Sequence, residues 1–236
     1  MIDIHCHILP EVDDGPKSWE TAETMCKMAA EDGIRHMVAT PHANDHYFYD
    51  REYLSGLVRD LERRIGGSPT LSLGCDFHLS YENMQSALVS AARYCIGLSQ
   101  YLLVEFSNFN IPPQIDDWMM RMRERGVVPI VTHPERNPIL QQTPERVLQW
   151  LELGCAVQVT ASAVTGLWGP RARQAAQWLL RNNAVQILAT DAHDPVHRPP
   201  ILSAARQIVA RQFGEQRAHM LVEDNPGAVL RNQAIA

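Results

Sequence analysis

The chain has 236 residues, of which 45% are hydrophobic and 20% are charged, and its formal net charge is -6. These values are typical of a globular protein, and α/β barrels reach this length as one domain. The negative charge argues against a general nucleic-acid-binding surface, which requires a basic face. No apolar stretch is long enough to span a bilayer, and the residues around Asp3 do not resemble a signal peptide. We therefore expect a cytoplasmic protein without membrane insertion.

Apolar strands alternate with amphipathic helices along the chain. The predicted strands cover residues 1–7, 37–42, 71–76, 102–105, 129–133 and 187–191. The predicted helices cover residues 18–31, 50–65, 84–92, 113–126, 144–154, 169–183 and 200–213. A last helix is predicted to begin with Asn225 as its N-cap and Pro226 as its first helical residue. About seven strand–helix units imply parallel strands with right-handed crossovers, and we expect them to close into a barrel.

Histidines and acidic residues recur where these strands end. His5 and His7 lie at the end of the first strand, and alternation along a strand places both on one side, about 7 Å apart at Cα. Other strands end in residues of the same kinds, namely His42, Asp76, Glu105, His133, Asp191 and His193. Because functional residues of a βα barrel share the C-terminal face, these side chains should meet on one rim. Mixed imidazoles and carboxylates predict a hydrolase with several Mn²⁺, Fe or Zn²⁺ ions.

The cysteines do not predict a second chemistry. Cys6, Cys26, Cys75, Cys95 and Cys155 are scattered without Cys-x-x-Cys spacing, which indicates reduced, mostly buried residues. Thiol-based phosphate hydrolysis needs a thiolate followed by a phosphate-binding loop in the pattern Cys-x5-Arg. No cysteine has an arginine at that offset, so this class of enzyme is excluded.

Seven short segments resemble the PHP (polymerase and histidinol phosphatase) superfamily. They are Asp3-Ile-His-Cys-His7, Asp13-Asp-Gly-Pro16, Thr40-Pro-His42, Glu105-Phe-Ser107, His133-Pro-Glu-Arg136, Asp191-Ala-His193 and Arg198-Pro-Pro200. Within that superfamily, the chain is similar to the bacterial metal-dependent protein-tyrosine phosphatases of capsule and exopolysaccharide loci. The match extends from Met1 to about Pro226, in order and with fitting spacing.

The resemblance implies a fold and a set of metal ligands. The expected fold is a distorted (β/α)7 TIM-like barrel that forms a single domain over residues 1–236. The expected cofactors are three divalent ions, with Mn²⁺ first and Fe or Zn²⁺ as alternatives. The implied ligands are His5, His7 and Asp191 for the first ion, Glu105 and His133 for the second, Asp76 as their bridge, and Asp14, His42 and His193 for the third. The family usually has Glu at the bridging position, and Asp76 is shorter by one methylene.

The resemblance also implies hydrolysis of phosphotyrosine on protein. The expected partner is a membrane-associated bacterial tyrosine kinase of polysaccharide export, with its tyrosine-rich tail as the substrate. Arg136 and Arg198 follow ligand motifs, and a guanidinium fork matches phosphate oxygens, so we predict both as catalytic phosphate clamps. The alternative for each arginine is a surface ion pair.

Two other functions remain open at this stage. The first is hydrolysis of a small phosphomonoester such as histidinol phosphate, although the Asp-Asp-Gly-Pro loop and the modest length favour the protein phosphatase. The second is a non-catalytic regulator that binds metal and phosphotyrosine. Only Asp76, which replaces the usual Glu, favours this second function.

Several further residues are weaker candidates. We interpret His36, His46 and His219 as surface or structural residues, and expect His78 and His197 nearer the rim. Cys6 should point away from the metals. The loop of residues 43–50, with Tyr47, Phe48 and Tyr49, could contact an aromatic phosphoester or simply pack. The tryptophans mostly show core spacing.

Overall fold

The computed structural model describes all 236 residues, and its nine strands are all parallel. The strands are β1 (Ile2–Cys6), β2 (His36–Ala39), β3 (His42–Ala43), β4 (Thr70–Leu73), β5 (Asp76–His78), β6 (Tyr101–Glu105), β7 (Val128–Thr132), β8 (Ala156–Thr160) and β9 (Ile187–Ala189). They pair in the orders β1-β2-β4 and β3-β5-β6-β7-β8-β9. This arrangement confirms the predicted α/β architecture.

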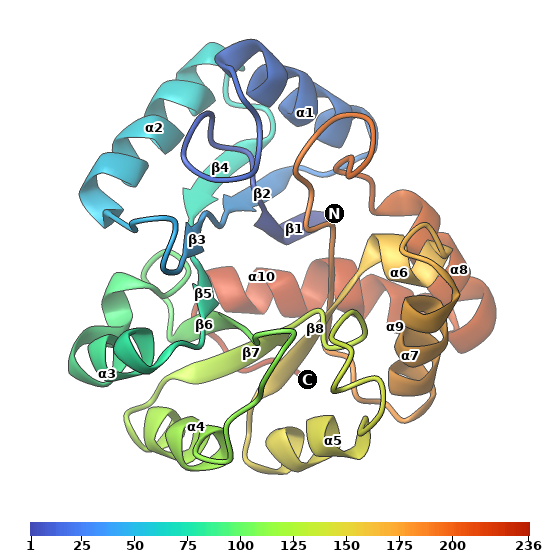
Figure 1. Cartoon of the computed structure of the whole chain (residues 1–236). Helices are drawn as coiled ribbons and strands as arrows, with labels where there is room; N and C mark the ends of the chain where they lie inside the picture. The colour runs from blue at the N-terminus through green and yellow to red at the C-terminus, as the bar shows by residue number, and fades with distance from the viewer.

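Backbone hydrogen bonds join the two sheets into a ring (Figure 1). Only two residues separate β2 from β3, and two separate β4 from β5, so each pair occupies one strand position. On the other side, the His7 amide donates to Ala192 O and the Asp191 amide donates to His5 O, both at 2.8 Å. The pairing therefore continues from β9 to β1 and gives seven strand positions.

The breaks within two of the predicted strands have local causes. Residues 37–42 were predicted as one strand, but Pro41 has no N–H to donate and the ladder stops beside it. Residues 71–76 are interrupted at Gly74, where a Cβ atom would lie 3.0 Å from the Val38 side chain and 3.1 Å from Ile96. The chain thus leaves the ladder at both places before it resumes pairing.

Helices surround the ring (Figure 1). They are α1 (Trp19–Glu31), α2 (Arg51–Arg64), α3 (Tyr81–Ser90), η1 (Ala91–Arg93), α4 (Ile115–Glu124), α5 (Glu145–Glu152), α6 (Ala161–Thr165), α7 (Pro170–Arg181), α8 (Ser203–Phe213), α9 (Glu215–His219), η2 (Met220–Asp224) and α10 (Asn225–Leu230). The predicted helices correspond to elements of this set with small shifts at their ends. β8 and α6 lie in residues 155–168, for which no element was specified. None of the helices combines the length and apolar character needed to cross a membrane.

α10 begins at Asn225, as predicted, but the predicted N-cap role of Asn225 is wrong. The helix runs on from α9 through the π-helical turn η2 into α10, and Asp224 and Asn225 both have helical backbone angles. Instead of capping, the buried Asn225 amide donates to Gln186 O at 2.8 Å and to Ala236 O at 3.1 Å. Asn225 therefore links this helix to the segment before β9 and to the C-terminal residue.

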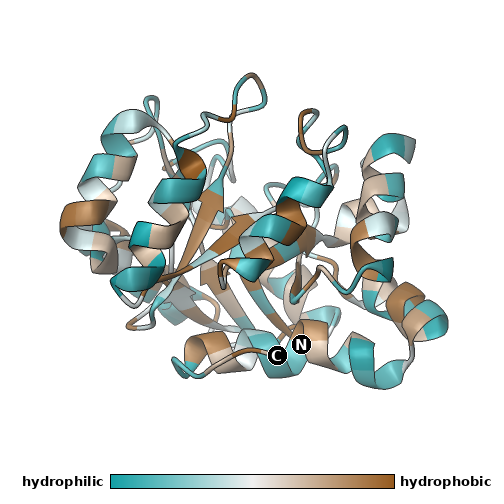
Figure 2. Ribbon diagram, turned by 90° about the horizontal axis from the view of Figure 1, so that it is seen from below, coloured by the Kyte–Doolittle hydropathy of each residue, from teal (hydrophilic) through white to brown (hydrophobic).

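The buried apolar residues form two clusters, one inside the ring of strands and one between the ring and the outer helices. The smaller cluster includes Ile4, Leu103, Ile130 and Ile187 from four strands and Val229 from α10, but no residue of α1 to α8, so it lies inside the ring. The larger cluster packs the strands against the outer helices. In Figure 2 the central strands are mainly apolar, whereas polar residues occur on the helices around them. The interior core thus occupies the end of the ring near α10.

Candidate metal centre

Strand alternation places the predicted ligands above the interior core. In β6, Leu103 belongs to the interior cluster and Glu105 is the next residue on the same face. The register of β1 with β2 is irregular, because Asp3 pairs with Met37 while Cys6 pairs with Ala39. β1 therefore has one more residue than β2 between these two pairs. This bulge lets Ile4 fill the core and lets His5 face the centre. Cys6 points the other way and donates from Sγ to Val38 O, as predicted.

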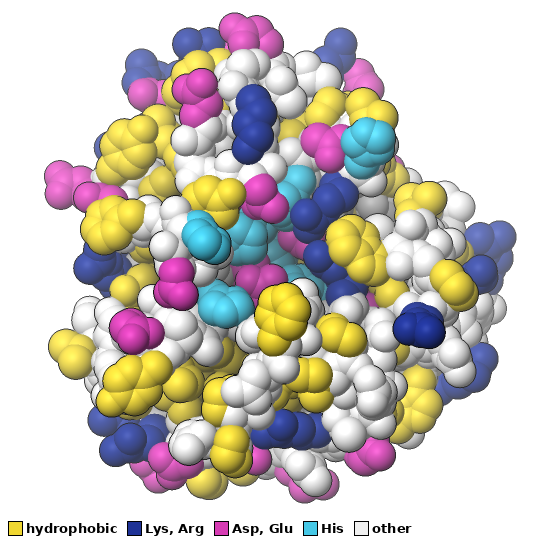
Figure 3. Space-filling view, viewed as in Figure 1, with side chains coloured by type: hydrophobic (Ala, Val, Ile, Leu, Met, Phe, Trp, Pro, Cys, Tyr) yellow, Lys and Arg dark blue, Asp and Glu magenta, His cyan; other side chains and the backbone are white.

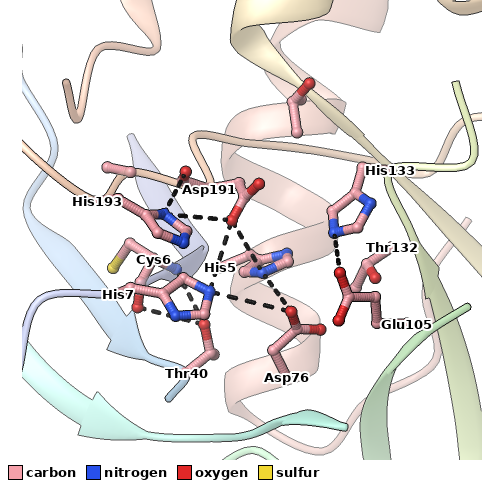
Figure 4. Close-up of polar contacts among 12 residues, drawn as sticks. His5, Cys6, His7, Thr40, Asp76, Glu105, Thr132, His133, Asp191 and His193 are labelled. Atoms are coloured by element: carbon pink, nitrogen blue, oxygen red, sulfur yellow. Dashed lines mark hydrogen bonds and ion pairs between the residues drawn. The ribbon is translucent and has the colours of Figure 1, made fainter. Parts of the chain in front are cut away.

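All nine predicted ligands meet at this end of the ring. They form four overlapping groups, in each of which the ligand atoms lie within 4.8 Å of one another: His7, Asp14, His42 and His193; His5, His7 and Asp76; His5, His133 and Asp191; and His42, Asp76 and Glu105. Figure 3 shows histidine and acidic side chains gathered in a central hollow with basic side chains beside it, and Figure 4 shows how several of these residues converge. No residue outside the predicted nine belongs to any group.

The grouping differs in detail from the implied one. His7 lies close enough to join the set of Asp14, His42 and His193. His133 groups with His5 and Asp191, although its Nε2 atom also lies 3.7 Å from Glu105 Oε1. Residues that belong to two groups are expected where one ligand bridges two neighbouring metal ions.

Five buried atoms at the centre have no hydrogen-bond partner. They are His5 Nε2, His7 Nε2, His42 Nδ1 and both carboxylate oxygens of Asp76. Buried polar atoms without partners are costly, and folded proteins seldom tolerate several together. Here nitrogen and carboxylate lone pairs converge, with His42 Nδ1 3.2 Å and His5 Nε2 3.5 Å from Asp76 Oδ2. This donor set fits divalent metal ions, and Asp76 is central to it despite its short side chain.

Two further residues orient the histidines. His7 Nδ1 lies 2.6 Å from Asp13 Oδ2, and His5 Nδ1 lies 2.9 Å from Gln158 Oε1. Partners of this kind set the tautomer and direct the other ring nitrogen toward a metal. Neither residue is among those predicted from the sequence. The adjacent Asp13-Asp14 pair was a usable signal for Asp13, whereas Gln158 has no local signature.

We expect Asp13→Asn to weaken metal binding by about 10- to 100-fold, the usual effect of losing a carboxylate that orients a ligating histidine. Asp13 also accepts from the Gly15 amide at 2.9 Å, so the loop should loosen as well. Titration calorimetry with Mn²⁺ would measure the change. Asp45→Asn, an exposed position in the loop after His42, is the control, and equal affinity of both variants would exclude the orienting role.

In the metal-free protein, the histidines of the site differ in their protonation state. Burial alone would lower the pKa of His5, but the charges of Asp76 and Asp191 raise it to about 9. Burial is likewise outweighed at His42, where the nearby carboxylates of Asp14 and Asp76 raise the pKa to about 12. At His7, burial and the neighbouring His193 lower the pKa to about 4. At pH 7, His5 and His42 therefore hold protons and His7 does not.

Metal binding should consequently release protons and should strengthen as the pH rises. An imidazole must be neutral to bind a metal, so His5 and His42 must each lose a proton at pH 7. We expect the apparent Mn²⁺ affinity to increase with pH through about 9, the pKa of His5, and to keep increasing above it, because His42 still holds its proton there. Calorimetry at one pH in two buffers of different ionisation enthalpy counts the protons. Identical heats in both buffers would contradict this expectation.

Asp191 links the metal ligands to the two predicted clamp arginines. Its Oδ1 atom lies 3.4 Å from His5 Nε2 and 3.5 Å from His7 Nε2. Its Oδ2 atom accepts from Arg136 Nη1 and, at 2.6 Å, from Arg198 Nη2. Burial would raise the pKa of Asp191, but Arg136, His5 and Arg198 hold it well below the usual range. Both arginines therefore lie at the edge of the centre, and neither forms the surface ion pair that was the alternative.

The weaker candidates divide between structural and rim positions. His36 bonds to Thr70 and Ser72 at 2.8 and 2.9 Å, which confirms its structural role. His78 Nδ1 lies 3.5 Å from Glu105 Oε2, at the rim as expected. The Tyr47 ring is stacked with His42 at a centroid distance of 6.0 Å, whereas Tyr49 is buried.

Comparison with known proteins agrees with this geometry. The family described as capsular polysaccharide synthesis, CpsB/CapC, matches residues 1–231. The tyrosine-protein phosphatase YwqE of Bacillus subtilis is 29% identical over 238 residues, covering 100% of this chain and 93% of YwqE. The tyrosine-protein phosphatase CpsB of Streptococcus agalactiae is 30% identical over 245 residues, covering 100% of both chains.

Solved structures extend the comparison to the fold. A solved structure from a study of two metal-dependent tyrosine phosphatases, YwqE of Bacillus subtilis and CpsB of Streptococcus pneumoniae, superposes on this chain with a TM-score of 0.92. The two chains are 28% identical, and the match covers 100% of this chain and 96% of the other. A phosphotriesterase homology protein of Escherichia coli shares the fold with a TM-score of 0.61 at 12% identity, over 95% of this chain and 96% of its own. The chain belongs to the CpsB/CapC family of capsular polysaccharide synthesis.

Proposed function

We propose that this protein is a metal-dependent protein-tyrosine phosphatase whose metals bind in the hollow at the C-terminal end of the ring. The observation that carries this proposal is the convergence of buried, unpartnered nitrogen and oxygen atoms of His5, His7, His42 and Asp76 beside two arginines. Relatives named tyrosine-protein phosphatases match the chain over its whole length, which supports the same activity here.

The proposed ligand sets are those that the resemblance implies, and they use the same nine residues that converge in the structure. They are His5, His7 and Asp191; Glu105 and His133; Asp76 between these two sets; and Asp14, His42 and His193. We propose three ions, with Mn²⁺ as the preferred metal and Fe or Zn²⁺ as alternatives, because the set mixes imidazoles with carboxylates. When bound, such ions lower the pKa of water to about 7 and neutralise the charge of a phosphoryl group.

The protein's own groups bind and orient the phosphate. Arg136 and Arg198 present N–H donors at the edge of the hollow, and a guanidinium can hold two phosphate oxygens at once. The Nε atom of Arg136 is buried without a partner, so this donor is not used by any other group of the protein. The tyrosyl group leaves as a phenol with a pKa of about 10, so it needs less help from an acid than an alkyl alcohol would.

We further propose that the substrate is the tyrosine-rich tail of a membrane-associated bacterial tyrosine kinase, which the enzyme would meet in the cytoplasm. The family's association with capsular polysaccharide synthesis supports a role in regulating that pathway. The open hollow in Figure 3 is compatible with an extended peptide, since the hollow lies on an exposed face of the molecule.

A substrate panel tests the proposal. Protein stripped with a chelator and reloaded with Mn²⁺ is offered a phosphotyrosine peptide, a phosphoserine peptide and histidinol phosphate. Mn²⁺-dependent phosphate release from phosphotyrosine alone is the expected result. A preference for histidinol phosphate would indicate a small-molecule phosphatase, and no release from any substrate would indicate the non-catalytic regulator.

A further inference from the structure

Both clamp arginines lie against the indole ring of Trp168. The Arg136 Cζ atom is 3.7 Å from the ring centroid, and the Arg198 Cζ atom is 5.2 Å from it. Both guanidinium groups also donate to the same oxygen of Asp191. Each guanidinium therefore contacts a carboxylate and an aromatic ring, and these are the two kinds of group that stabilise a partly buried arginine.

Trp168 is held by its own turn. It lies between α6 and α7, and its amide donates to Ser162 O at 3.1 Å. Gly166 and Gly169, on either side, have φ angles of +94° and +91°, which side chains other than glycine rarely adopt. The turn fixes the backbone that presents the indole to the arginines. Trp168 is the exception to the expectation that the tryptophans mostly occupy core positions, because it is 37% exposed.

The contact leaves the phosphate-binding donors of the arginines available. An aromatic ring covers a face of a guanidinium, whereas the N–H groups point outward in its plane. The stacked Arg136 still donates from Nη1 to Asp191, and its Nε donor has no partner. A long arginine side chain also loses rotamer freedom when it binds an anion, and a preformed position reduces that cost.

We propose that Trp168 is a positioning residue that holds Arg136 and Arg198 ready for the phosphate group. This inference rests on the proposed function, because it assigns the arginines to the phosphate. Trp168 acts through the two arginines and has no part in metal binding. Its loss should therefore weaken phosphate binding without changing the metal content.

The test compares Trp168→Leu, which keeps an apolar side chain, with Trp168→Phe, which keeps an aromatic face. The probe is inorganic phosphate, titrated calorimetrically into Mn²⁺-loaded protein, with metal content measured on the same samples. We expect Trp168→Leu to weaken phosphate binding by about 3- to 30-fold, the range of one or two cation–π contacts, and Trp168→Phe to restore most of it. The kcat/KM for a phosphotyrosine peptide should fall in parallel.

Trp19→Leu is the matched control. Trp19 lies in α1 and stacks with Arg64 of α2, at 4.5 Å from Cζ to the ring centroid, so the same substitution removes the same kind of contact elsewhere. It should leave phosphate binding unchanged. Unaltered phosphate affinity in Trp168→Leu, or loss of metal from it, would overturn the positioning role. Because phosphate binding is measured without turnover, inactivity of the wild type would count against the proposed function and not against Trp168.

Discussion

Asp191→Asn is expected to abolish phosphotyrosine hydrolysis and to lower the bound metal. The aspartate faces the histidines with Oδ1 and accepts from both arginines with Oδ2, so one charge serves two sets of groups. Asparagine has nearly the same shape but no charge. It would leave Arg136 and Arg198 without their buried counter-ion and would weaken the metal site. We expect kcat/KM to fall on the order of 10³-fold or more.

The measurement combines kinetics at saturating Mn²⁺ with elemental analysis of the dialysed protein. Asp60→Asn is the control, because Asp60 is an acidic residue on α2 that pairs only with Arg63 on the surface. It should retain both activity and metal. Unchanged turnover in Asp191→Asn would remove Asp191 from the proposed site.

Arg136→Ala should separate substrate binding from metal binding. We expect kcat/KM to fall by about 10²- to 10³-fold, as when a donor to developing phosphoryl charge is removed. The metal content should stay nearly intact, since Arg198 still donates to Asp191 at 2.6 Å. Arg136→Lys should recover only part of the loss, because an ammonium lacks the planar fork and stacks less well on Trp168.

Kinetics, metal analysis and phosphate titration on the same preparations decide the outcome. Arg171→Ala, at an exposed position of α7, controls for the loss of a positive charge. If Arg136→Ala lost its metal while Arg171→Ala kept it, Arg136 would belong to the metal centre and the clamp role would be wrong.

The sequence by itself determined the architecture and the residues that meet at its centre. Alternating strands and helices imply parallel pairing, and the C-terminal ends of parallel strands converge whatever their distance along the chain. His5 and Asp191 are far apart in sequence, yet His5 lies near the end of β1 and Asp191 follows β9, and these two strands lie side by side. The position at a strand end was therefore enough to predict that eight of the nine ligands would lie together. Asp14, in the loop after β1, was assigned only from the resemblance to the PHP superfamily.

Only the tertiary structure decided how those residues are held. The bulge in β1 depends on its register with β2, and Gln158 reaches His5 from a strand more than a hundred residues later. No pattern in the sequence indicated that Trp168, in the turn after α6, would lie over Arg136. A local sequence pattern predicts which face of a strand or helix a side chain occupies. The orientation of that side chain depends on contacts with distant segments of the chain, and these contacts form only when the ring closes.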